Sequence, residues 1–420
     1  MKTNKNRDMT PFDMSIRPKR PSALLLPLMW AASFAMTQRG GLKIDKSGIK
    51  GLKLPYLVLA EHQGFTDYYI APLAFFPRRA SYVSDMEGFA NYGRWLYSAL
   101  GCVATRRYIP DVSLIHNIRH VLEKNKDILV IYPEARHSNV GTNSLLAPSI
   151  GKLVRLLKVP VVLMKTHGSY LDAPIWDEKH RRGAPLSVKL TLALTPEDIR
   201  TRSAEEITAF LNREFHYDEH RWQIVNKVRL KYPKRAEGLQ KMLYQCPACQ
   251  TECAVTVAGA RLTCRSCGKA WELEETGLLR AVGGEREDIH IPDWYELQRA
   301  QVARQIAEGG YVLNTEVTIQ ALPNEKGFVP FGEGRLTHGP EGFRLRIPST
   351  GQELFFPTEQ LFSIHNELDY RGWGDCVVLS TRDCCYYLFP DARKISVVKI
   401  QLAAEEFHQE YLRKRNTHDE

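Results

Sequence analysis

The segment Leu57-Val-Leu-Ala-Glu-His-Gln-Gly-Phe-Thr-Asp67 joins a short apolar run to the start of a helical pattern. Residues 57–60 predict a buried strand and residues 67–76 predict a helix. His62 lies at the end of the strand, where we expect it to be exposed, and Asp67 follows at the start of the helix. Asp67 can therefore turn back to the imidazole. A carboxylate on one ring nitrogen fixes the tautomer, so that the other nitrogen can accept a proton from a hydroxyl.

Strand-like and helix-like segments continue to alternate along the chain, which is typical of an α/β architecture with a sheet flanked by helices. Short apolar runs predict further strands at residues 80–84, 101–105, 128–132 and 159–164. Apolar residues at helical spacing predict helices at residues 89–100, 112–124 and 150–157. We expect this domain to end near Phe215.

Three later segments lie on or beside predicted strands, two of them with charged residues and the third wholly apolar. They are Gly101-Cys-Val-Ala-Thr-Arg-Arg107, Tyr132-Pro-Glu-Ala-Arg-His-Ser138 and Val159-Pro-Val-Val162. With His62 and Asp67, they resemble in order and spacing the four motifs of the glycerolipid acyltransferases, the 1-acylglycerol-3-phosphate acyltransferase family. The resemblance covers about residues 53–215 and implies that this stretch is an α/β acyltransferase domain.

The resemblance also implies a reaction. A fatty acyl group would move from acyl-CoA or acyl carrier protein to a lysophospholipid hydroxyl, with 1-acylglycerol-3-phosphate as the family acceptor, in phospholipid biosynthesis or remodelling. His62 would act as the general base and Asp67 would orient it. The residues implied to bind substrate are Arg106, Arg107, Glu134, Arg136, His137 and Ser138. Arginine suits phosphate because its guanidinium group presents a planar fork of donors.

Several positions depart from the family pattern. Glu61 stands where the family commonly has asparagine, and Ala104 replaces a large apolar residue. Ala135 and Arg136 replace a Gly-Thr pair, and His137 stands where arginine is usual. Because these changes fall on acceptor-binding positions and leave the histidine and aspartate intact, the reaction class follows more firmly than the acceptor.

Four of the nine cysteines form two close pairs, Cys246-Pro-Ala-Cys249 and Cys264-Arg-Ser-Cys267. Two short turns that each offer two thiolates match a tetrahedral Zn²⁺ site, and the segment resembles a zinc ribbon. Four thiolates complete the coordination shell, which predicts a structural metal. A redox-active Cys-x-x-Cys is the alternative. The odd cysteine count argues against a disulfide framework, and the metal-type spacing favours a reducing compartment, hence the cytoplasm.

The N-terminal region combines an apolar run with basic flanks. Residues 23–36 (ALLLPLMWAASFAM) are too short to span a bilayer, which requires about 20 apolar residues. We interpret them as an interfacial anchor on the inner face of the cell membrane. A signal peptide and a buried core helix are the alternatives. The formal net charge of +9 favours an anionic partner, either phospholipid head groups or nucleic acid.

The C-terminal third shows short alternating runs, one of them at residues 395–400, between predicted helices at residues 294–307 and 403–413. This pattern resembles a pleckstrin-homology-like (PH-like) module, which binds phospholipid head groups or proteins. A small β-sandwich or barrel is the alternative. The predicted parts of the chain are an anchor segment (1–50), an acyltransferase domain (51–215), a basic helical linker (216–245), a zinc ribbon (246–282) and a β-rich domain capped by a helix (283–420).

Two other functions compete with the enzyme. One is a protein or nucleic-acid adaptor that uses the ribbon while the enzyme domain is degenerate, and the other is a scaffold that senses lipid surfaces. Neither needs His62 and Asp67, which therefore favour the enzyme. The ribbon mixes both charges, so we do not expect nucleic acid to bind. The expected partners are the lysophospholipid, the acyl thioester, the membrane surface, and acyl carrier protein or another protein bound through the ribbon or C-terminal module.

Overall fold

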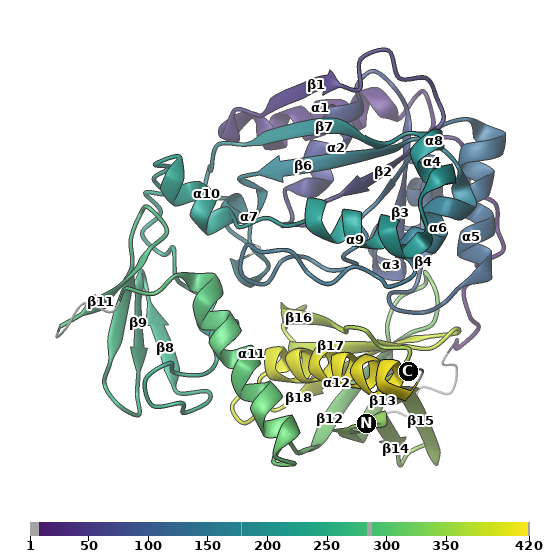
Figure 1. Ribbon diagram of the computed structural model, residues 1–420. Coiled ribbons are helices and arrows are strands. Elements are labelled where there is room, and N and C mark those ends of the chain that lie inside the picture. The colour runs from purple at the N-terminus through teal and green to yellow at the C-terminus, as the bar shows by residue number, and fades with distance from the viewer. Residues whose placement is uncertain (1–7, 178, 284–287, 419–420) are drawn as a thin grey trace. The chain divides into compact units, whose positions relative to one another are not determined.

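The computed structural model describes residues 8–177, 179–283 and 288–418 (Figure 1). Two places that the sequence analysis covers lie outside the described residues. They are the start of the anchor segment (residues 1–7) and a stretch at the start of the β-rich domain (residues 284–287), and the same holds for residue 178 of the acyltransferase domain and residues 419–420 of the β-rich domain.

The chain folds into two compact units, which we call the central unit and the terminal unit. The central unit joins residues 20–82 to residues 119–298. The described part of the terminal unit consists of residues 8–19, 83–118 and 299–418. Residues 83–118, which the sequence places inside the acyltransferase domain, thus cluster with the C-terminal part of the chain.

A seven-stranded mixed sheet has the order β1-β7-β6-β2-β5-β3-β4, in which β4 and the end of β3 belong to the terminal unit. The strands are β1 (Lys43–Gly48), β2 (Tyr56–Ala60), β3 (Ala80–Asp85), β4 (Cys102–Thr105), β5 (Ile128–Ile131), β6 (Val161–His167) and β7 (Ser187–Leu194). β2 lies between β5 and β6 and runs parallel to both. All of β2 is buried, which explains why its sequence is continuously apolar.

Helices pack on both faces of this sheet in the central unit, and Figure 1 shows α9 in front of it and α1 behind it. The α-helices of this unit are α1 (Leu26–Thr37), α2 (Asp67–Phe75), α6 (Ile150–Leu157), α7 (Ser169–Asp172), α8 (Pro196–Thr201), α9 (Ala204–Glu214) and α10 (Glu219–Val225). Short 3-10 helices cover Gln38–Gly40, Ile175–Asp177 and Leu239–Lys241, and a π-helix covers His120–Asn125. The prediction of an α/β domain with a sheet flanked by helices is therefore confirmed.

The cysteine module, residues 246–282, adds a small antiparallel sheet to the central unit in the order β11-β10-β9-β8. Its strands are β8 (Val255–Ala258), β9 (Arg261–Cys264), β10 (Ala270–Leu273) and β11 (Leu279–Val282). Trp271 of β10 is buried against Trp294, with 4.9 Å between the ring centroids. Trp294 belongs to α11 (Ile291–Ala307), which runs from the central unit into the terminal unit.

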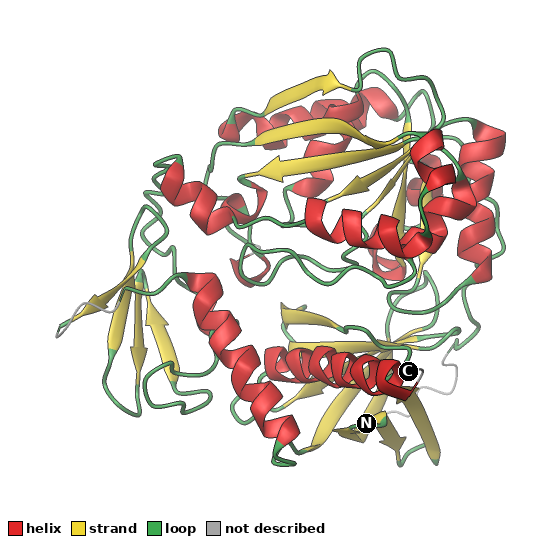
Figure 2. Ribbon diagram, viewed as in Figure 1, coloured by secondary structure: helices red, strands yellow, loops and turns green. Residues whose placement is uncertain are grey.

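The terminal unit contains a seven-stranded sheet of antiparallel neighbours in the order β15-β14-β13-β12-β18-β17-β16. The strands are β12 (Leu313–Leu322), β13 (Val329–Gly339), β14 (Gly342–Ile347), β15 (Gln352–Pro357), β16 (His365–Tyr370), β17 (Gly374–Ser380) and β18 (Cys385–Pro390). The helices of residues 83–118 are α3 (Met86–Tyr92), α4 (Arg94–Ala99) and α5 (Val112–Arg119), which ends one residue into the central unit. The prediction of a β-rich C-terminal part closed by a helix is confirmed, because α12 (Val397–His418) lies along β16 and β17 (Figure 2).

Two local predictions are wrong. Most of the run at residues 395–400, predicted as a strand, belongs to α12, which begins at Val397; just before it, the Ser396 hydroxyl accepts a hydrogen bond from the Val398 N–H. Periodicity alone does not separate a short apolar run in a strand from one in a buried helix. The helix predicted at residues 89–100 is two helices, because Gly93 between them adopts a φ of 83°.

The predicted anchor forms α1, a helix of 12 residues. In the part of the chain that the structure describes, no helix combines the length and hydrophobicity needed to cross a membrane.

Candidate active site and cysteine cluster

The loop that carries His62 leaves β2 near the middle of the sheet. Such carboxyl ends of parallel strands are the usual position of sites in α/β sheets. The loop closes quickly, since α2 begins at Asp67 and the Asp67 N–H donates to the Gly64 carbonyl at 3.1 Å. A histidine and an aspartate five residues apart are thereby folded toward each other.

The side chains of His62 and Asp67 are in contact, with 3.2 Å between Nδ1 of the imidazole and Oδ2 of the carboxylate. The same Oδ2 accepts hydrogen bonds from the backbone N–H groups of Gln63 at 2.7 Å and Gly64 at 3.1 Å. Burial raises the pKa of the Asp67 carboxyl to about 6, although the hydrogen bonds that it accepts act in the opposite direction. The carboxylate thus fixes the loop and faces Nδ1 of the ring, as an orienting residue must.

The expectation that His62 is exposed is wrong, because only 6% of the residue is accessible. Three aromatic side chains surround its ring. The centroid distances are 4.0 Å to His137, 4.3 Å to Tyr132 and 5.8 Å to Tyr68. The end of a strand is exposed only if no loop from a distant part of the chain covers it. Here residues 132–138 cover His62. A proton acceptor in such a water-poor pocket interacts strongly with neighbouring charges.

The covering loop is tied to the His62 loop through its backbone. Glu134 is buried, and its carboxylate accepts hydrogen bonds from the N–H groups of His62 at 3.1 Å and Ser144 at 2.6 Å. Burial raises the pKa of Glu134 to about 7. Ser138 closes the arrangement, since its N–H donates to the His62 carbonyl at 2.9 Å. The structure therefore brings His62, Asp67, Glu134, His137 and Ser138 together.

Arg136 lies in the same loop and is buried, with Nη1 donating to the His137 carbonyl at 3.3 Å. The remaining two predicted arginines belong to the terminal unit. The Arg106 guanidinium group donates to main-chain carbonyls of its own unit, including that of Pro323 at 3.2 Å. Arg107 forms an ion pair with Asp85 and a longer one, 4.0 Å, with Glu367. Both guanidinium groups therefore have partners inside the terminal unit.

Further polar residues that the sequence analysis did not assign to the site are buried behind the His62 loop. Glu61 accepts a hydrogen bond from the Thr166 N–H at 2.9 Å, and the Gln63 side-chain amide donates to Glu61 at 3.2 Å and to Glu219 at 3.4 Å. Burial raises the pKa of Glu61 well above its usual value, and the carboxylates of Glu134 and Glu219 add to this effect. In the sequence, the signal for these buried polar residues was Glu61, a charged residue directly after a fully apolar strand.

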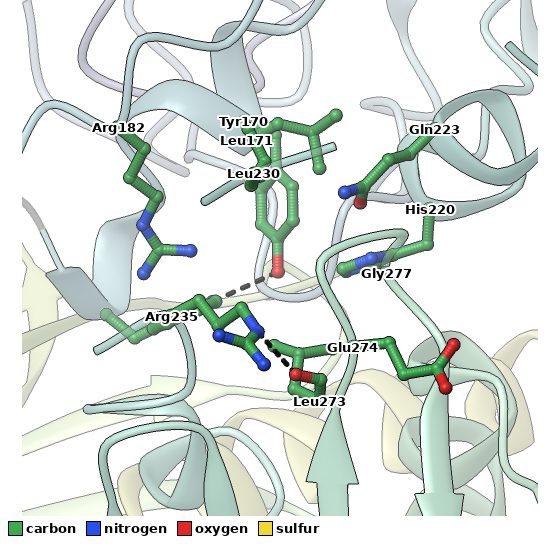
Figure 3. Close-up of a pocket in the computed structure, with 11 residues that line it drawn as sticks. Tyr170, Leu171, Arg182, His220, Gln223, Leu230, Arg235, Leu273, Glu274 and Gly277 are labelled. Atoms are coloured by element: carbon green, nitrogen blue, oxygen red, sulfur yellow. Dashed lines mark hydrogen bonds between the residues drawn. The ribbon is translucent and has the colours of Figure 1, made fainter. Parts of the chain in front are cut away.

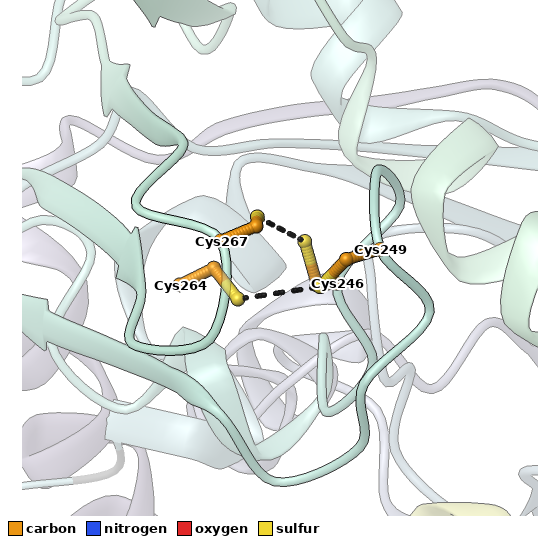
Figure 4. Close-up of side chains that lie close together, drawn as sticks. All are labelled: Cys246, Cys249, Cys264 and Cys267. Atoms are coloured by element: carbon orange, nitrogen blue, oxygen red, sulfur yellow. Dashed lines mark hydrogen bonds between the residues drawn. The ribbon is translucent and has the colours of Figure 1, made fainter.

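The four paired cysteines meet in one cluster of the cysteine module, in which all four Sγ atoms lie within 4.8 Å of one another (Figure 4). The separations are 3.8 Å from Cys246 to Cys267 and 3.7 Å from Cys249 to Cys264. Tetrahedral Zn²⁺ with Zn–S bonds of about 2.3 Å implies sulfur separations of about 3.8 Å. The cluster can therefore hold one metal ion such as zinc.

A separate small pocket lies between the cysteine module and the rest of the central unit (Figure 3). Its lining includes Tyr170 and Arg182 on one side, Leu273 and Gly277 of the cysteine module on another, and His220 of α10. Burial lowers the pKa of His220 to about 3, so this imidazole is neutral. None of the site residues predicted from the sequence lines this pocket.

Comparison with known proteins bears on the His62 region. Residues 43–164 match the family model described as Acyltransferase. One matching solved structure is the 1-acyl-sn-glycerophosphate acyltransferase of Thermotoga maritima, with 17% identity over 46% of this chain and 76% of that chain and a TM-score of 0.38. No curated protein matches the chain. The family match covers residues 43–164, which carry His62 and Asp67, so the His62 region is similar to acyltransferase domains.

Proposed function

We propose that the protein transfers a fatty acyl group from an acyl thioester, either acyl-CoA or acyl carrier protein, to a lysophospholipid hydroxyl. The observation that carries the proposal is the 3.2 Å contact between His62 and Asp67 inside the matched acyltransferase domain. The first acceptor to test is 1-acylglycerol-3-phosphate, which would place the enzyme in phospholipid biosynthesis or remodelling.

In the proposed reaction, His62 takes the proton of the acceptor hydroxyl as its oxygen attacks the thioester carbonyl. Asp67 stabilises the imidazolium that forms and keeps the ring in one orientation. The new carbon–oxygen ester bond forms and the carbon–sulfur bond breaks, after which the imidazolium returns the proton to the leaving thiolate. No covalent acyl-enzyme is required.

The acceptor head group is assigned to the loop that covers His62. Arg136, His137 and Ser138 lie on this loop beside the imidazole, and Arg136 supplies a cation for a phosphate. Arg106 and Arg107, the phosphate ligands implied by the resemblance, already have partners in the terminal unit. Binding of phosphate by these two residues would require those contacts to be exchanged.

We further propose that α1 rests in the interface of the inner membrane leaflet, so that the protein is a peripheral protein of the cytoplasmic side. Outward residues of this helix are apolar, with exposures of 68% for Leu28 and 61% for Phe34, and Leu24 just before the helix is 86% exposed. Polar Ser33 and Thr37 are buried instead, the reverse of an ordinary surface helix. No charged residue occurs from position 21 to 38, and basic residues flank the run.

Vesicle flotation tests the membrane proposal. With anionic phospholipid vesicles, Leu28→Ser should weaken binding by about tenfold, because it removes the burial of one leucine side chain in the lipid. Val225→Ser is the matched control, since Val225 is also apolar and 70% exposed but lies on α10. Equal binding of wild type and Leu28→Ser would remove α1 from the membrane contact.

For the other two parts of the chain, we propose a structural zinc ribbon at residues 246–282 and a PH-like module at residues 283–420. The four-thiol cluster supports the first, and the seven-stranded antiparallel sheet closed by α12 supports the second. Either part would offer acyl carrier protein or another protein a surface to bind.

The decisive experiment offers a mass-tagged acyl thioester and a panel of lysolipids to wild-type protein and to His62→Ala. A tagged phospholipid should form, and its rate should fall at least about 100-fold in the variant, the usual contribution of a general base. His180→Ala, which changes an exposed histidine, is the matched control and should keep the wild-type rate. If no thioester and acceptor give product, the adaptor function takes precedence.

A further inference from the structure

We propose that Glu219, on helix α10, is a positioning residue for the His62 loop. The inference rests on the proposed function, because positioning matters only if His62 and Asp67 perform chemistry. Glu219 lies well beyond residues 43–164, the part of the chain that matches the acyltransferase family model. It would therefore extend the working site into the segment that the sequence presents as a linker.

The Glu219 carboxylate is fully buried and touches three residues of the central unit. Its Oε2 accepts a hydrogen bond from the Gly168 N–H at 2.7 Å, and its Oε1 lies 2.7 Å from Nδ1 of His167. Oε1 also accepts a hydrogen bond from the Gln63 side-chain amide at 3.4 Å. One carboxylate thus joins the end of β6 to the His62 loop.

Gln63 is the residue through which this contact reaches the candidate base. It is fully buried, and its side-chain amide donates to the Thr166 carbonyl at 2.7 Å as well as to Glu219. Its backbone N–H donates to the Asp67 carboxylate at 2.7 Å. The same residue is therefore held by Glu219 on one side and holds the orienting carboxylate on the other.

The position of α10 is itself defined by contacts at both of its ends. The Glu219 N–H donates to the Gly141 carbonyl at 2.8 Å, next to the loop that covers His62. Before it, Asp218 lies 2.7 Å from His290, and one turn later the Gln223 amide donates to the Glu275 carbonyl of the cysteine module at 3.0 Å. Figure 3 shows Gln223 and His220 beside Gly277 of this module. A short helix anchored in this way presents Glu219 in a fixed place.

A buried carboxylate is unfavourable unless donors face it, and Glu219 is one of four buried carboxylates around the His62 loop, with Glu61, Asp67 and Glu134. Packing alone would be served better by an apolar side chain of similar size. Directed hydrogen bonds instead fix the position and direction of the His62 loop. The His62–Asp67 pair requires such a fixed position to transfer a proton.

The test compares Glu219→Ala and Glu219→Gln with Glu214→Ala in the full-length protein. Glu214 is the matched control, because it is a half-exposed carboxylate that contacts Lys165, close to Thr166 in the chain. Steady-state acyl transfer gives kcat and KM for each folded variant. In parallel, the ¹⁵N-imidazole resonances of His62, assigned by their loss in His62→Ala, report the ring environment without any turnover.

We expect Glu219→Ala to lower kcat by roughly tenfold to 100-fold at little change in KM, as expected for a displaced catalytic group, and to shift the His62 resonances. Glu219→Gln keeps an acceptor for the Gly168 N–H and should recover part of the rate. Glu214→Ala should match wild type in both measurements.

A folded Glu219→Ala with wild-type kcat and unchanged His62 resonances would overturn the inference. If that variant does not fold, Glu219→Gln decides in the same way, because a purely structural role predicts a lower melting temperature with unchanged kcat and resonances. Absence of turnover in wild type would instead defeat the proposed function, and the His62 resonances would still decide the role of Glu219.

Discussion

Two groups of carboxylates, one buried under the His62 loop and one partly buried in the terminal unit, differ in their main partners. Around the His62 loop, Asp67 and Glu134 accept hydrogen bonds from backbone N–H groups. In the terminal unit, Asp85 and Glu367 face the guanidinium group of Arg107. The first arrangement places carboxylates against the main chain. The second gathers two carboxylates around one cation, while Asp85 also accepts a hydrogen bond from the Gly88 N–H at 3.1 Å and Glu367 lies 2.6 Å from Nε2 of His365.

The difference separates two tasks. A backbone N–H points in a direction set by the chain, so a carboxylate bound to several of them defines the path of a loop. An arginine on a long side chain joins distant segments but leaves their backbones to other contacts. The first arrangement suits a loop that must hold a base in place. The second fastens residues 83–118 to the C-terminal sheet.

Removal of the metal ion should have the largest effect on stability. It should affect the central unit and leave the sheet of the terminal unit unchanged. Structural zinc sites have apparent binding free energies of about 10–16 kcal/mol, so chelation should unfold the cysteine module. Hydrogen exchange measured by mass spectrometry should rise in residues 246–282 and in α10, but not in β12 to β18. Cys264→Ala should reproduce this pattern, whereas Cys253→Ala, outside the cluster, should keep one bound metal per chain. Uniform exchange after chelation would contradict the assignment.

Asp67→Asn should have the next largest effect, confined to catalysis. Asparagine keeps an oxygen for the N–H groups of Gln63 and Gly64 but lacks the charge that stabilises the imidazolium. We expect kcat to fall by about 10²–10⁴-fold with a near-normal melting temperature. Asp45→Asn on the exposed strand β1 is the control for an aspartate outside the site. Wild-type turnover in Asp67→Asn would remove the aspartate from the mechanism.

Arg107→Ala should act on stability. Removing the cation leaves Asp85 and Glu367 facing each other, and breaking such a pair costs about 3 kcal/mol in the free energy of unfolding. Urea unfolding at pH 8 measures this cost. Arg119→Ala breaks an exposed ion pair with Glu123 and should change the same quantity by less than about 0.5 kcal/mol. Equal effects of the two substitutions would show that the Arg107 contacts are not stabilising.

Glu87→Gln should have the smallest effect and one that depends on pH. Burial, with Glu367 and Asp85 nearby, raises the pKa of Glu87 from 4.5 to about 8. The folded protein therefore keeps a proton that the unfolded chain has released between these pH values, and its stability falls as the pH rises through this window. Glutamine cannot ionise, so the variant should be more stable than wild type at pH 8.

At pH 4.5, where the folded protein holds Glu87 protonated, Glu87→Gln and wild type should unfold at nearly the same temperature. Thermal unfolding at both pH values gives this comparison. Glu316→Gln, which changes an exposed carboxylate of the same unit, should match wild type at both. A stabilisation that is equal at pH 4.5 and pH 8 would show that ionisation of Glu87 is not the cause.

Much of the central unit follows from local sequence. β2, α2 and the cysteine pairs can be predicted because each depends on residues close together in the chain, such as the continuous apolar run of Tyr56–Ala60. Strands β1 and β7 were not predicted. The sequence of β7 nevertheless carries an alternating signal, because Val188 and Leu190 are buried and Lys189 between them is exposed. The contact of His62 with Asp67 was predicted from their place between a strand and a helix, together with the family resemblance of the later segments, because the spacing alone is a weak signal.

What the sequence by itself determined is therefore the set of short-range units: the His62–Asp67 loop, the four-cysteine cluster and most of the strands. Only the tertiary structure decided that His62 is buried, that Arg107 pairs within the terminal unit, and that Glu219 contacts Gln63 across 156 positions of chain. The physical reason is that local patterns fix backbone conformation. The choice of a distant partner depends instead on which surfaces the whole chain must bury together.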